Sequence, residues 1–80
     1  MKYVYLLESV SYSKKRYIGL TDDLNRRFKE HNAGKSPHTS KYKPWKIVLA
    51  IRFSDDQKAD AFEKYLKTGS GHAFAKRRLW

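Results

Sequence analysis

Cysteine is missing from this 80-residue sequence, so neither a disulfide bond nor a zinc site built on thiolates can hold its fold together. Long hydrophobic segments are missing too, because the longest apolar run, Ile47–Ile51, is far too short to span a lipid bilayer. The N-terminus holds too few apolar residues before Glu8 to be a signal peptide. These absences predict a cytoplasmic protein that has no membrane partner.

Acidic residues are scarce in the chain. Eight Asp and Glu stand against eighteen Lys and Arg, which gives a net charge of +10 and an isoelectric point near 10.0. Two stretches, 34–52 and 64–80, each contain five Lys or Arg and no acid, and aromatic residues are interleaved with both. This pattern favours a polyanionic partner, with nucleic acid ahead of an anionic membrane surface.

The length of the chain predicts a single domain, 1–80, with a small core. A chain of this size has no room for both a large scaffold and a separate site. We therefore expect the functional side chains to project from the same strands and helices that form the core.

The hydrophobic pattern predicts an α+β domain of order ββαβα(α), in which helices flank a small three-stranded antiparallel sheet. The expected strands are Tyr3–Leu7, Arg16–Leu20 and Trp45–Phe53. The expected helices are one capped by Thr21 or Asp22 that ends at 32–34, one from about Asp55 to Lys67 capped by Ser54, and a short one from about His72, after a break at Thr68–Gly71.

Ionisable side chains interrupt the apolar faces of the first two expected helices. In the first helix, Arg27 and His31 share the face of the apolar residues at positions 24 and 28. In the second, Glu63 shares the face of the apolar residues at 59, 62 and 66. Two explanations remain open: a buried ion pair between Arg27 and Glu63 with His31 as a core histidine, or a functional site.

The chemistry of these side chains is informative when the two strand tyrosines are included. Two phenols, a guanidinium, an imidazole and one carboxylate make a poor zinc site and contain no serine or cysteine triad. A lone carboxylate suits Mg²⁺, which keeps several waters and binds substrate phosphates. Arginine stabilises the charge that builds on a phosphate in the transition state. On a basic surface, the set suggests phosphodiester hydrolysis.

The sequence resembles the GIY-YIG nuclease superfamily, and in particular its short stand-alone bacterial members. The resemblance rests on the segments "YVYLL", "YIGLT", "DLNRRFKEHNAGK", "HTSKYKPWKIV" and "FEKYLKTGSG", in this order, and covers almost the whole chain. In the first family motif Val4 replaces isoleucine and Tyr3 stands in the place of glycine. The resemblance implies a GIY-YIG-like fold and an endonuclease that hydrolyses DNA with weak sequence specificity; RNA remains an alternative substrate.

The resemblance also implies roles for individual residues. The catalytic residues would be Tyr5, Tyr17, Arg27 rather than the neighbouring Arg26, and His31; either tyrosine would accept a proton from the attacking water. Glu63 would hold one Mg²⁺ or Mn²⁺. Residues of the basic stretches are expected to contact nucleic acid: Lys35, His38, Ser40, Lys41, Lys43, Lys76, Arg77 and Arg78.

Two further alternatives follow from the resemblance. Family members such as excinucleases and homing endonucleases carry a separate DNA-reading domain, and this sequence contains none, so either target selection is weak or a protein partner supplies it. The alternative function is a nucleic-acid-binding module of the same fold with little or no catalysis. A purely structural or membrane-surface protein would account for the charge but not for Arg27, His31 and Glu63 on apolar faces.

Overall fold

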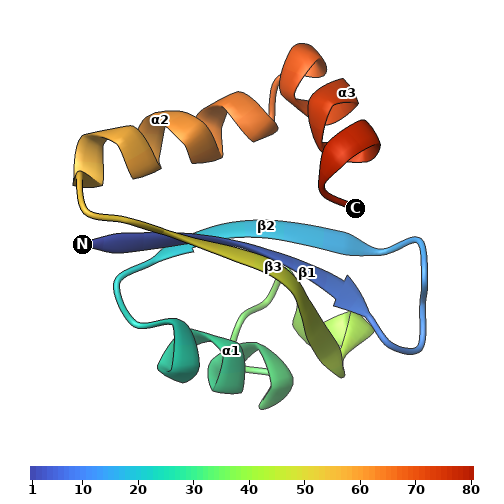
Figure 1. Cartoon of the computed structure of the whole chain (residues 1–80). Helices are drawn as coiled ribbons and strands as arrows, with labels where there is room; N and C mark the ends of the chain where they lie inside the picture. The colour runs from blue at the N-terminus through green and yellow to red at the C-terminus, as the bar shows by residue number, and fades with distance from the viewer.

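The computed structural model describes residues 1–80 and shows a sheet between two layers of helices (Figure 1). Both strand pairs are antiparallel, and the strand order is β2-β1-β3. The predicted α+β class, element order and three-stranded sheet are therefore confirmed. The elements are β1 (Lys2–Ser9), β2 (Arg16–Thr21), α1 (Leu24–Asn32), the 3-10 helix η1 (Ser40–Tyr42), β3 (Trp45–Phe53), α2 (Asp56–Leu66) and α3 (Gly69–Arg78).

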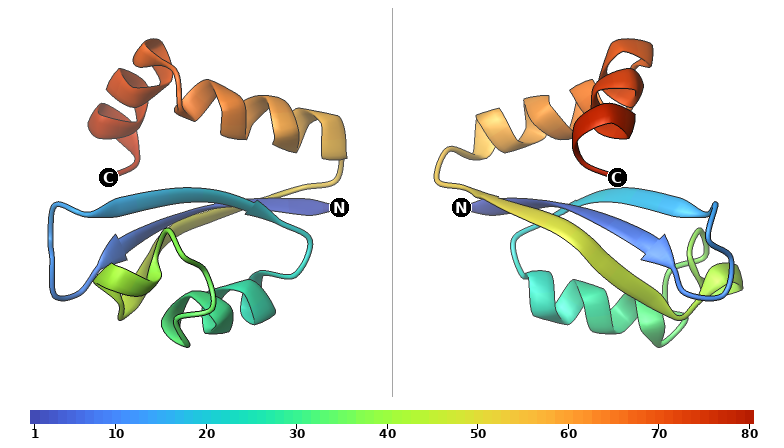
Figure 2. Two further views of the ribbon diagram at one scale, coloured as in Figure 1. Left: turned by 180° about the vertical axis from the view of Figure 1, so that it is seen from behind. Right: turned by 45° about the vertical axis from the view of Figure 1, so that its right-hand side comes forward.

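β1 is the central strand, and helices cover both faces of the sheet (Figure 2). Figure 2 shows α1 on one side of the sheet and α2 with α3 on the other. Tyr5 and Leu7 point toward the α1 side, whereas Val4 and Leu6 point toward the α2 and α3 side, and all four are buried. Successive residues of β1 therefore alternate between the two faces of the sheet. Burial on both sides requires apolar or aromatic residues at consecutive positions.

Two separate apolar clusters form, one on each side of the sheet. Beside α1, the buried residues Tyr5, Leu7 and Trp45 pack with partly buried neighbours that include Leu24 and Phe28 of α1. The predicted inward faces of both helices are confirmed. On the other side, the buried members are Val4, Leu6, Ala59, Leu66 and Ala75.

The predicted caps of the first two helices are wrong by one residue. Asp23, and not Thr21 or Asp22, caps α1, because its carboxylate accepts a hydrogen bond of 3.1 Å from the backbone N–H three residues later. Asp55, and not Ser54, caps α2 in the same way. A carboxylate satisfies the free N–H groups and also carries a charge that the positive end of the helix dipole favours.

The predicted break after the second helix is confirmed at Lys67 and Thr68, but the predicted start of the third helix near His72 is wrong, because α3 begins at Gly69. The Thr68 hydroxyl caps the helix by accepting a hydrogen bond of 3.1 Å from the backbone N–H of Gly71. Gly71 is the point where α3 crosses the end of α2. A Cβ atom there would lie 1.7 Å from the carbonyl oxygen of Tyr65, so only glycine permits this crossing.

None of the helices has the length and apolarity needed to cross a membrane.

Candidate active site

Tyr5 and Gly19 are paired across β1 and β2. The Tyr5 ring lies so close to Gly19 that a Cβ atom on residue 19 would be 2.3 Å from it. Only glycine allows a strand backbone to approach an aromatic ring in this way. Tyr5 is thereby held against β2 with an exposed fraction of 1%.

A buried chain of hydrogen bonds begins at the Tyr5 hydroxyl. The Tyr5 oxygen lies 2.8 Å from Nε2 of His31, and Nδ1 of His31 lies 2.7 Å from Oγ1 of Thr39. His31 and Thr39 are fully buried. A neutral imidazole has one donor and one acceptor nitrogen. The chain therefore either donates from Tyr5 through His31 to Thr39 or donates in the reverse direction, and both directions connect two hydroxyl groups through one imidazole.

Thr39 was not among the predicted site residues. It lies in the basic loop between α1 and β3, and its carbonyl oxygen accepts a hydrogen bond of 2.9 Å from the indole Nε1 of Trp45. The backbone of Trp45 is in turn bound through both its N–H and its C=O to the side chain of Asn32 at the end of α1. Nothing in the spacing of Thr39 marks it in the sequence, because only the folding of the loop back onto α1 brings it to His31.

Tyr17 and Arg27 complete the cluster. The Tyr17 ring centroid is 4.9 Å from that of His31 and 6.2 Å from that of Tyr5. Arg27 lies one helical turn before His31 on α1, and its Nη1 donates a hydrogen bond of 3.0 Å to Glu30. Its side chain remains 30% exposed. The fold thus brings together the four residues that the sequence predicted as catalytic.

The electrostatics of the cluster differ from those of free side chains. Burial raises the pKa of Tyr5 to about 12, and the neighbouring Tyr17 adds to this effect while Arg27 opposes it. Desolvation lowers the pKa of Arg27, but the hydrogen bond to Glu30 and the two nearby phenols outweigh it, so that this pKa is raised overall. At neutral pH, Tyr5 keeps its proton and Arg27 keeps its charge.

His31 is uncharged at neutral pH. Burial, together with the positive charge of Arg27, lowers its pKa to about 4, while Glu30 opposes the shift. A neutral ring fits both hydrogen bonds, with one nitrogen as donor and the other as acceptor, and burial disfavours the charged ring. His31 is therefore suited to hold the Tyr5 hydroxyl in place through a hydrogen bond, and not to act as a fixed positive charge.

Glu63 lies apart from these four residues. It belongs to α2, on the opposite side of the sheet from α1 (Figure 1), and its carboxylate forms an ion pair with Lys67. Arg27 pairs with Glu30 instead. The alternative of a buried ion pair between Arg27 and Glu63 is therefore wrong. The Glu63 side chain is 15% exposed, so it is shielded without being sealed from solvent.

The donor set around Glu63 limits which metal it can hold. No group of three His, Cys, Asp or Glu side chains forms a cluster anywhere in the chain. A single carboxylate does not suffice for zinc or calcium, which take most of their ligands from the protein. It is enough for Mg²⁺, which keeps several waters and draws the remaining ligands from substrate phosphates. Glu63 therefore fits a hard divalent cation, which would compete with Lys67 for the carboxylate.

The predicted nucleic-acid-binding residues fall on both sides of the sheet. One set follows α1 along the chain, and of its members only Ser40 is partly buried, whereas the others are exposed. The second set lies on α3 in the opposite layer. The first set consists of Lys35, His38, Ser40, Lys41 and Lys43, and the second of Lys76, Arg77 and Arg78.

Comparison with known proteins agrees with the resemblance to the GIY-YIG superfamily. The family model described as the GIY-YIG catalytic domain matches residues 1–77. The chain is 38% identical over 76 residues to a UPF0213 protein of Cupriavidus necator, a match that covers 90% of this chain and 80% of the relative. It is 38% identical over 52 residues to the UPF0213 protein YazA of Bacillus subtilis, covering 64% of this chain and 52% of the relative.

A longer relative carries a functional name. Over 65 residues the chain is 40% identical to a protein of Giardia intestinalis named as a homolog of SLX1, a structure-specific endonuclease subunit. This match covers 76% of the chain but only 18% of the relative, so the chain spans less than a fifth of that protein.

Proposed function

The chain belongs to the GIY-YIG family of catalytic domains, which are nucleases, and on this basis we propose that it is an endonuclease that uses Mg²⁺ or Mn²⁺ to hydrolyse phosphodiester bonds in DNA. The observation that carries the proposal is the contact of Tyr5, Tyr17 and His31 beside Arg27 on a chain with a net charge of +10. We also propose weak intrinsic sequence specificity, because basic side chains contact phosphates, which carry no sequence information.

We assign Tyr17 as the phenol that accepts a proton from the attacking water. It is only partly buried, whereas Tyr5 is 1% exposed and its hydroxyl is already bound to His31. A phenol with a pKa near 10 is a poor base at neutral pH. Arg27 lies close to both phenols and would stabilise the phenolate form of Tyr17, which is the form that accepts a proton from the attacking water and becomes the neutral phenol. The chain from Tyr5 through His31 to Thr39 holds the rings behind Tyr17 in place.

Arg27 has a second role in this proposal. Its guanidinium keeps its charge at any physiological pH and its side chain is 30% exposed, so a phosphate can reach it. The hydrogen bond to Glu30 orients the group without consuming all five of its N–H donors. Arg27 would therefore stabilise the negative charge that develops on the phosphate oxygens.

Glu63 would hold the divalent cation, which supplies charge stabilisation to the phosphate and to the leaving oxygen when it is bound. The Glu63 carboxylate and the phenols lie on different sides of the sheet, and β2 is the edge strand between them. There, Tyr17 and Lys67, the partner of Glu63, line the same groove. A strand of nucleic acid at this edge would be in reach of both halves of the site.

A nicking assay tests the proposal. Supercoiled plasmid, branched DNA and structured RNA are incubated with the protein in Mg²⁺, in Mn²⁺ or in EDTA. We expect nicking of DNA that requires a divalent cation. Arg27→Ala should reduce the rate by about 10²–10³, because it removes one preorganised group that stabilises charge.

Arg26→Ala is the matched control, because Arg26 is the adjacent residue of α1 and its side chain is 61% exposed. It should leave the nicking rate nearly unchanged. If the wild-type protein binds DNA and cuts none of the substrates with either cation, the nuclease proposal is wrong and the nucleic-acid-binding module takes its place. The observation that favours that second function is that Arg27 and Glu63 are each already paired within the protein.

A further inference from the structure

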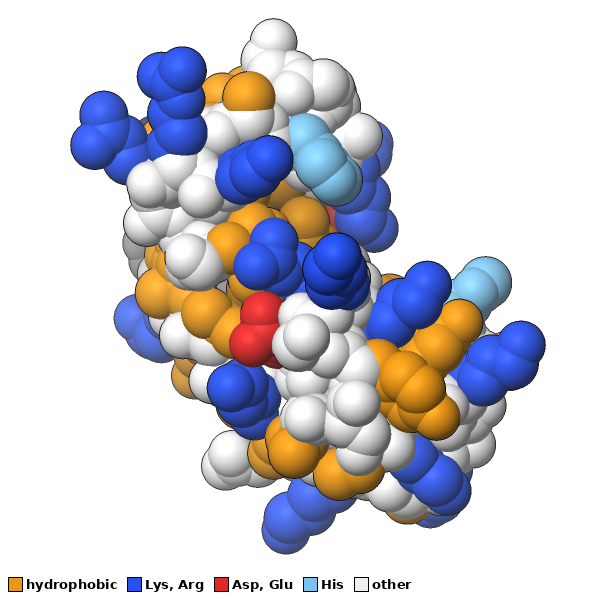
Figure 3. Space-filling view, turned by 90° about the vertical axis from the view of Figure 1, so that its right-hand side faces the viewer, with side chains coloured by type: hydrophobic (Ala, Val, Ile, Leu, Met, Phe, Trp, Pro, Cys, Tyr) orange, Lys and Arg blue, Asp and Glu red, His pale blue; other side chains and the backbone are white.

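A basic groove that the sequence did not predict runs between β2 and α3. It has a volume of about 480 Å³, and no acidic residue lines it. Figure 3 shows the face of the molecule on which the turn before β2 and α3 lie, where blue Lys and Arg side chains far outweigh the single acidic patch. The lining residues are Lys14, Lys15, Arg16, Tyr17, Ile18, Lys67, His72, Lys76 and Trp80.

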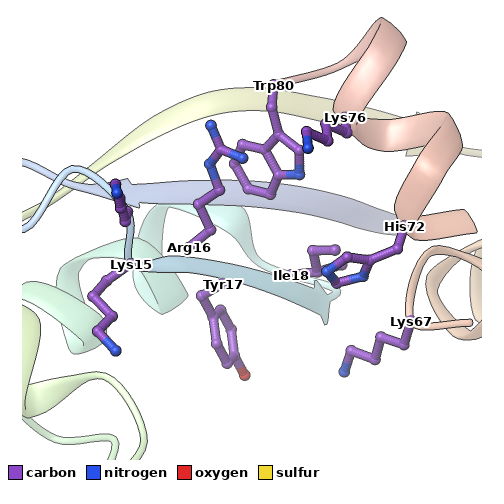
Figure 4. Close-up of a pocket in the computed structure, with 9 residues that line it drawn as sticks. Lys15, Arg16, Tyr17, Ile18, Lys67, His72, Lys76 and Trp80 are labelled. Carbon is purple, nitrogen blue, oxygen red and sulfur yellow. The ribbon is translucent and has the colours of Figure 1, made fainter. Parts of the chain in front are cut away.

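An aromatic residue closes one side of the basic groove. Trp80 is partly buried against the core cluster of α2 and α3, and the guanidinium carbon of Arg16 lies 4.7 Å from the centroid of its ring. In Figure 4, Trp80, Lys76 and His72 extend from the α3 side toward Arg16 and Ile18 on β2. The indole therefore packs against the core and is covered by the Arg16 cation.

The basic groove is connected to both halves of the candidate active site. Tyr17 lines the groove, and its ring points away from Trp80 in Figure 4, toward the side of the sheet on which it contacts His31. Lys67 lines the groove and is paired with Glu63. Glu8 is the other carboxylate at its margin, 3.4 Å from Arg16. A ligand in the groove would therefore contact Tyr17 and Lys67, the ion-pair partner of Glu63.

We propose that the basic groove binds an unpaired segment of single-stranded nucleic acid next to the bond that is cut, with one base stacked on Trp80. This inference takes its substrate class from the proposed nuclease function. Lys and Arg side chains along a groove follow a phosphate backbone, and an aromatic face accepts any base that is not already stacked in a duplex. Arg16 then moves from the indole to a phosphate as the base takes its place.

The size of the groove favours a single strand over a duplex. Hollows of about 300–1,000 Å³ enclose ligands the size of a drug molecule. One or two nucleotides are of this size, whereas a base-paired helix is far wider and would meet only the rim. The basic residues on the α1 side of the sheet are free to contact the duplex part of a branched substrate.

Binding to a short oligothymidylate, measured by fluorescence anisotropy in EDTA, tests the proposal without any cleavage. Trp80→Ala should weaken binding about 10- to 100-fold, because one stacked base is lost, and should weaken binding to a blunt duplex much less. Trp80→Phe keeps an aromatic face and should restore most of the affinity. Phe74→Ala is the matched control, since Phe74 is an exposed aromatic residue of α3, the helix that precedes Trp80, and lies outside the groove, and it should have no effect.

A pair of charge variants keeps the test decisive if Trp80→Ala fails to fold. Lys76→Ala removes a cation that lines the groove, and Lys58→Ala removes an exposed cation of the first turn of α2, outside the groove. Only Lys76→Ala should weaken oligothymidylate binding. Equal effects of the two variants, or of Trp80→Ala and Phe74→Ala, would overturn the proposal. A protein that binds through the groove but never cuts would instead refute the nuclease function and leave the groove in place.

Discussion

At the scale of single residues, one glycine and one threonine determine the geometry of the candidate site. Gly19 lets the Tyr5 ring lie against β2, and Thr39 occupies the second nitrogen of His31. Burial keeps His31 neutral and Tyr5 protonated at neutral pH. The reactivity of the cluster is thus left to Tyr17 and Arg27, which remain partly accessible to solvent.

The first prediction concerns the pH dependence of stability. The pKa of His31 is about 4 in the folded chain, against about 6.5 for a free histidine, so the unfolded chain binds protons first as the pH falls. The contribution of His31 is fully present above pH 6.5 and is lost as the pH falls from about 6.5 to about 4. The loss should amount to about 3 kcal/mol, at 1.36 kcal/mol per pKa unit.

Urea denaturation of the wild type and of His31→Gln between pH 4 and pH 8 measures this contribution. The difference in unfolding free energy between the two proteins should shrink toward acid pH, because Gln does not titrate. His72→Gln, which changes an exposed histidine, is the control and should show a constant difference. A difference for His31→Gln that does not change with pH would show that His31 titrates normally in the folded state.

The second prediction separates the metal site from the phosphate site. Glu63→Gln should weaken Mn²⁺ binding, because an amide lacks the charge that a hard cation prefers. Electron paramagnetic resonance measures this binding, since the signal of the free ion decreases as Mn²⁺ binds. Arg27→Ala should leave Mn²⁺ binding unchanged and reduce cutting. Glu8→Gln is the control, since Glu8 is also a partly shielded glutamate paired with cations. Unchanged Mn²⁺ affinity in Glu63→Gln would remove Glu63 from the cation site.

At the scale of secondary-structure elements, the junction of α2 and α3 determines the shape of the basic groove. Gly71 allows α3 to cross the end of α2 at close range, and this crossing places Lys76 and Trp80 opposite Arg16. The side chain of Thr68 fixes where α3 begins. The direction of α3 therefore follows from a local cap and a close contact between backbones.

The third prediction compares two glycines of α3. Gly71→Ala should destabilise the protein by about 2–3 kcal/mol, because the new Cβ would overlap the carbonyl oxygen of Tyr65 and the helices would have to separate. Gly69→Ala meets no atom within 4 Å and should be neutral or stabilising by less than about 1 kcal/mol, since alanine favours a helix. Urea denaturation of both variants measures the two effects. Similar losses for both would show that helix propensity, and not the crossing, makes Gly71 necessary.

At the scale of the whole molecule, the sheet divides the basic residues into two sets. The residues after α1 lie on the side of Tyr5 and His31, and those of α3 lie on the other side. A duplex that reaches the phenols from the α1 side would therefore contact the first set, while the basic groove at the β2 edge receives an unpaired segment. The net charge of +10 acts on both sides and attracts nucleic acid of any sequence.

The fourth prediction uses this division. Each neutralised phosphate contributes about −0.9 to the slope of log K against log salt concentration on duplex DNA, so contacts to four to six phosphates give a slope of about −4 to −5. Changing Lys41 and Lys43 together to Ala should flatten the slope by about one to two and weaken all duplex sequences alike. Changing Arg77 and Arg78 together should have a smaller effect.

Anisotropy titrations at several salt concentrations, in EDTA, measure these slopes. Glu63→Gln is the control, because it changes a residue assigned to the cation and should leave the slope nearly unchanged in the absence of metal. A flat salt dependence of the wild type would contradict binding through phosphates. A larger effect of the Arg77 and Arg78 changes would place the duplex on the α3 side of the sheet.

Much of the fold could be predicted from the sequence, because periodicity reports which side chains are buried. The alternation in β1 and the helical spacing of Leu24, Phe28 and His31 each depend only on neighbours along the chain. The same spacing placed Arg27 and His31 on the inner face of α1, and the structure confirms that face. Cap positions were less accurate, because Asp23 competes with two adjacent residues that have suitable side chains.

What the sequence determined by itself is thus the set of elements, their buried faces, the positive charge and the residues of the family motifs. The tertiary structure alone decided that Glu63 lies across the sheet from Arg27, that Thr39 binds His31, and that Trp80 faces Arg16 over the basic groove. The physical reason is the distance along the chain. Periodicity describes neighbours within one element, whereas these contacts depend on how loops and crossing helices place separate elements in space.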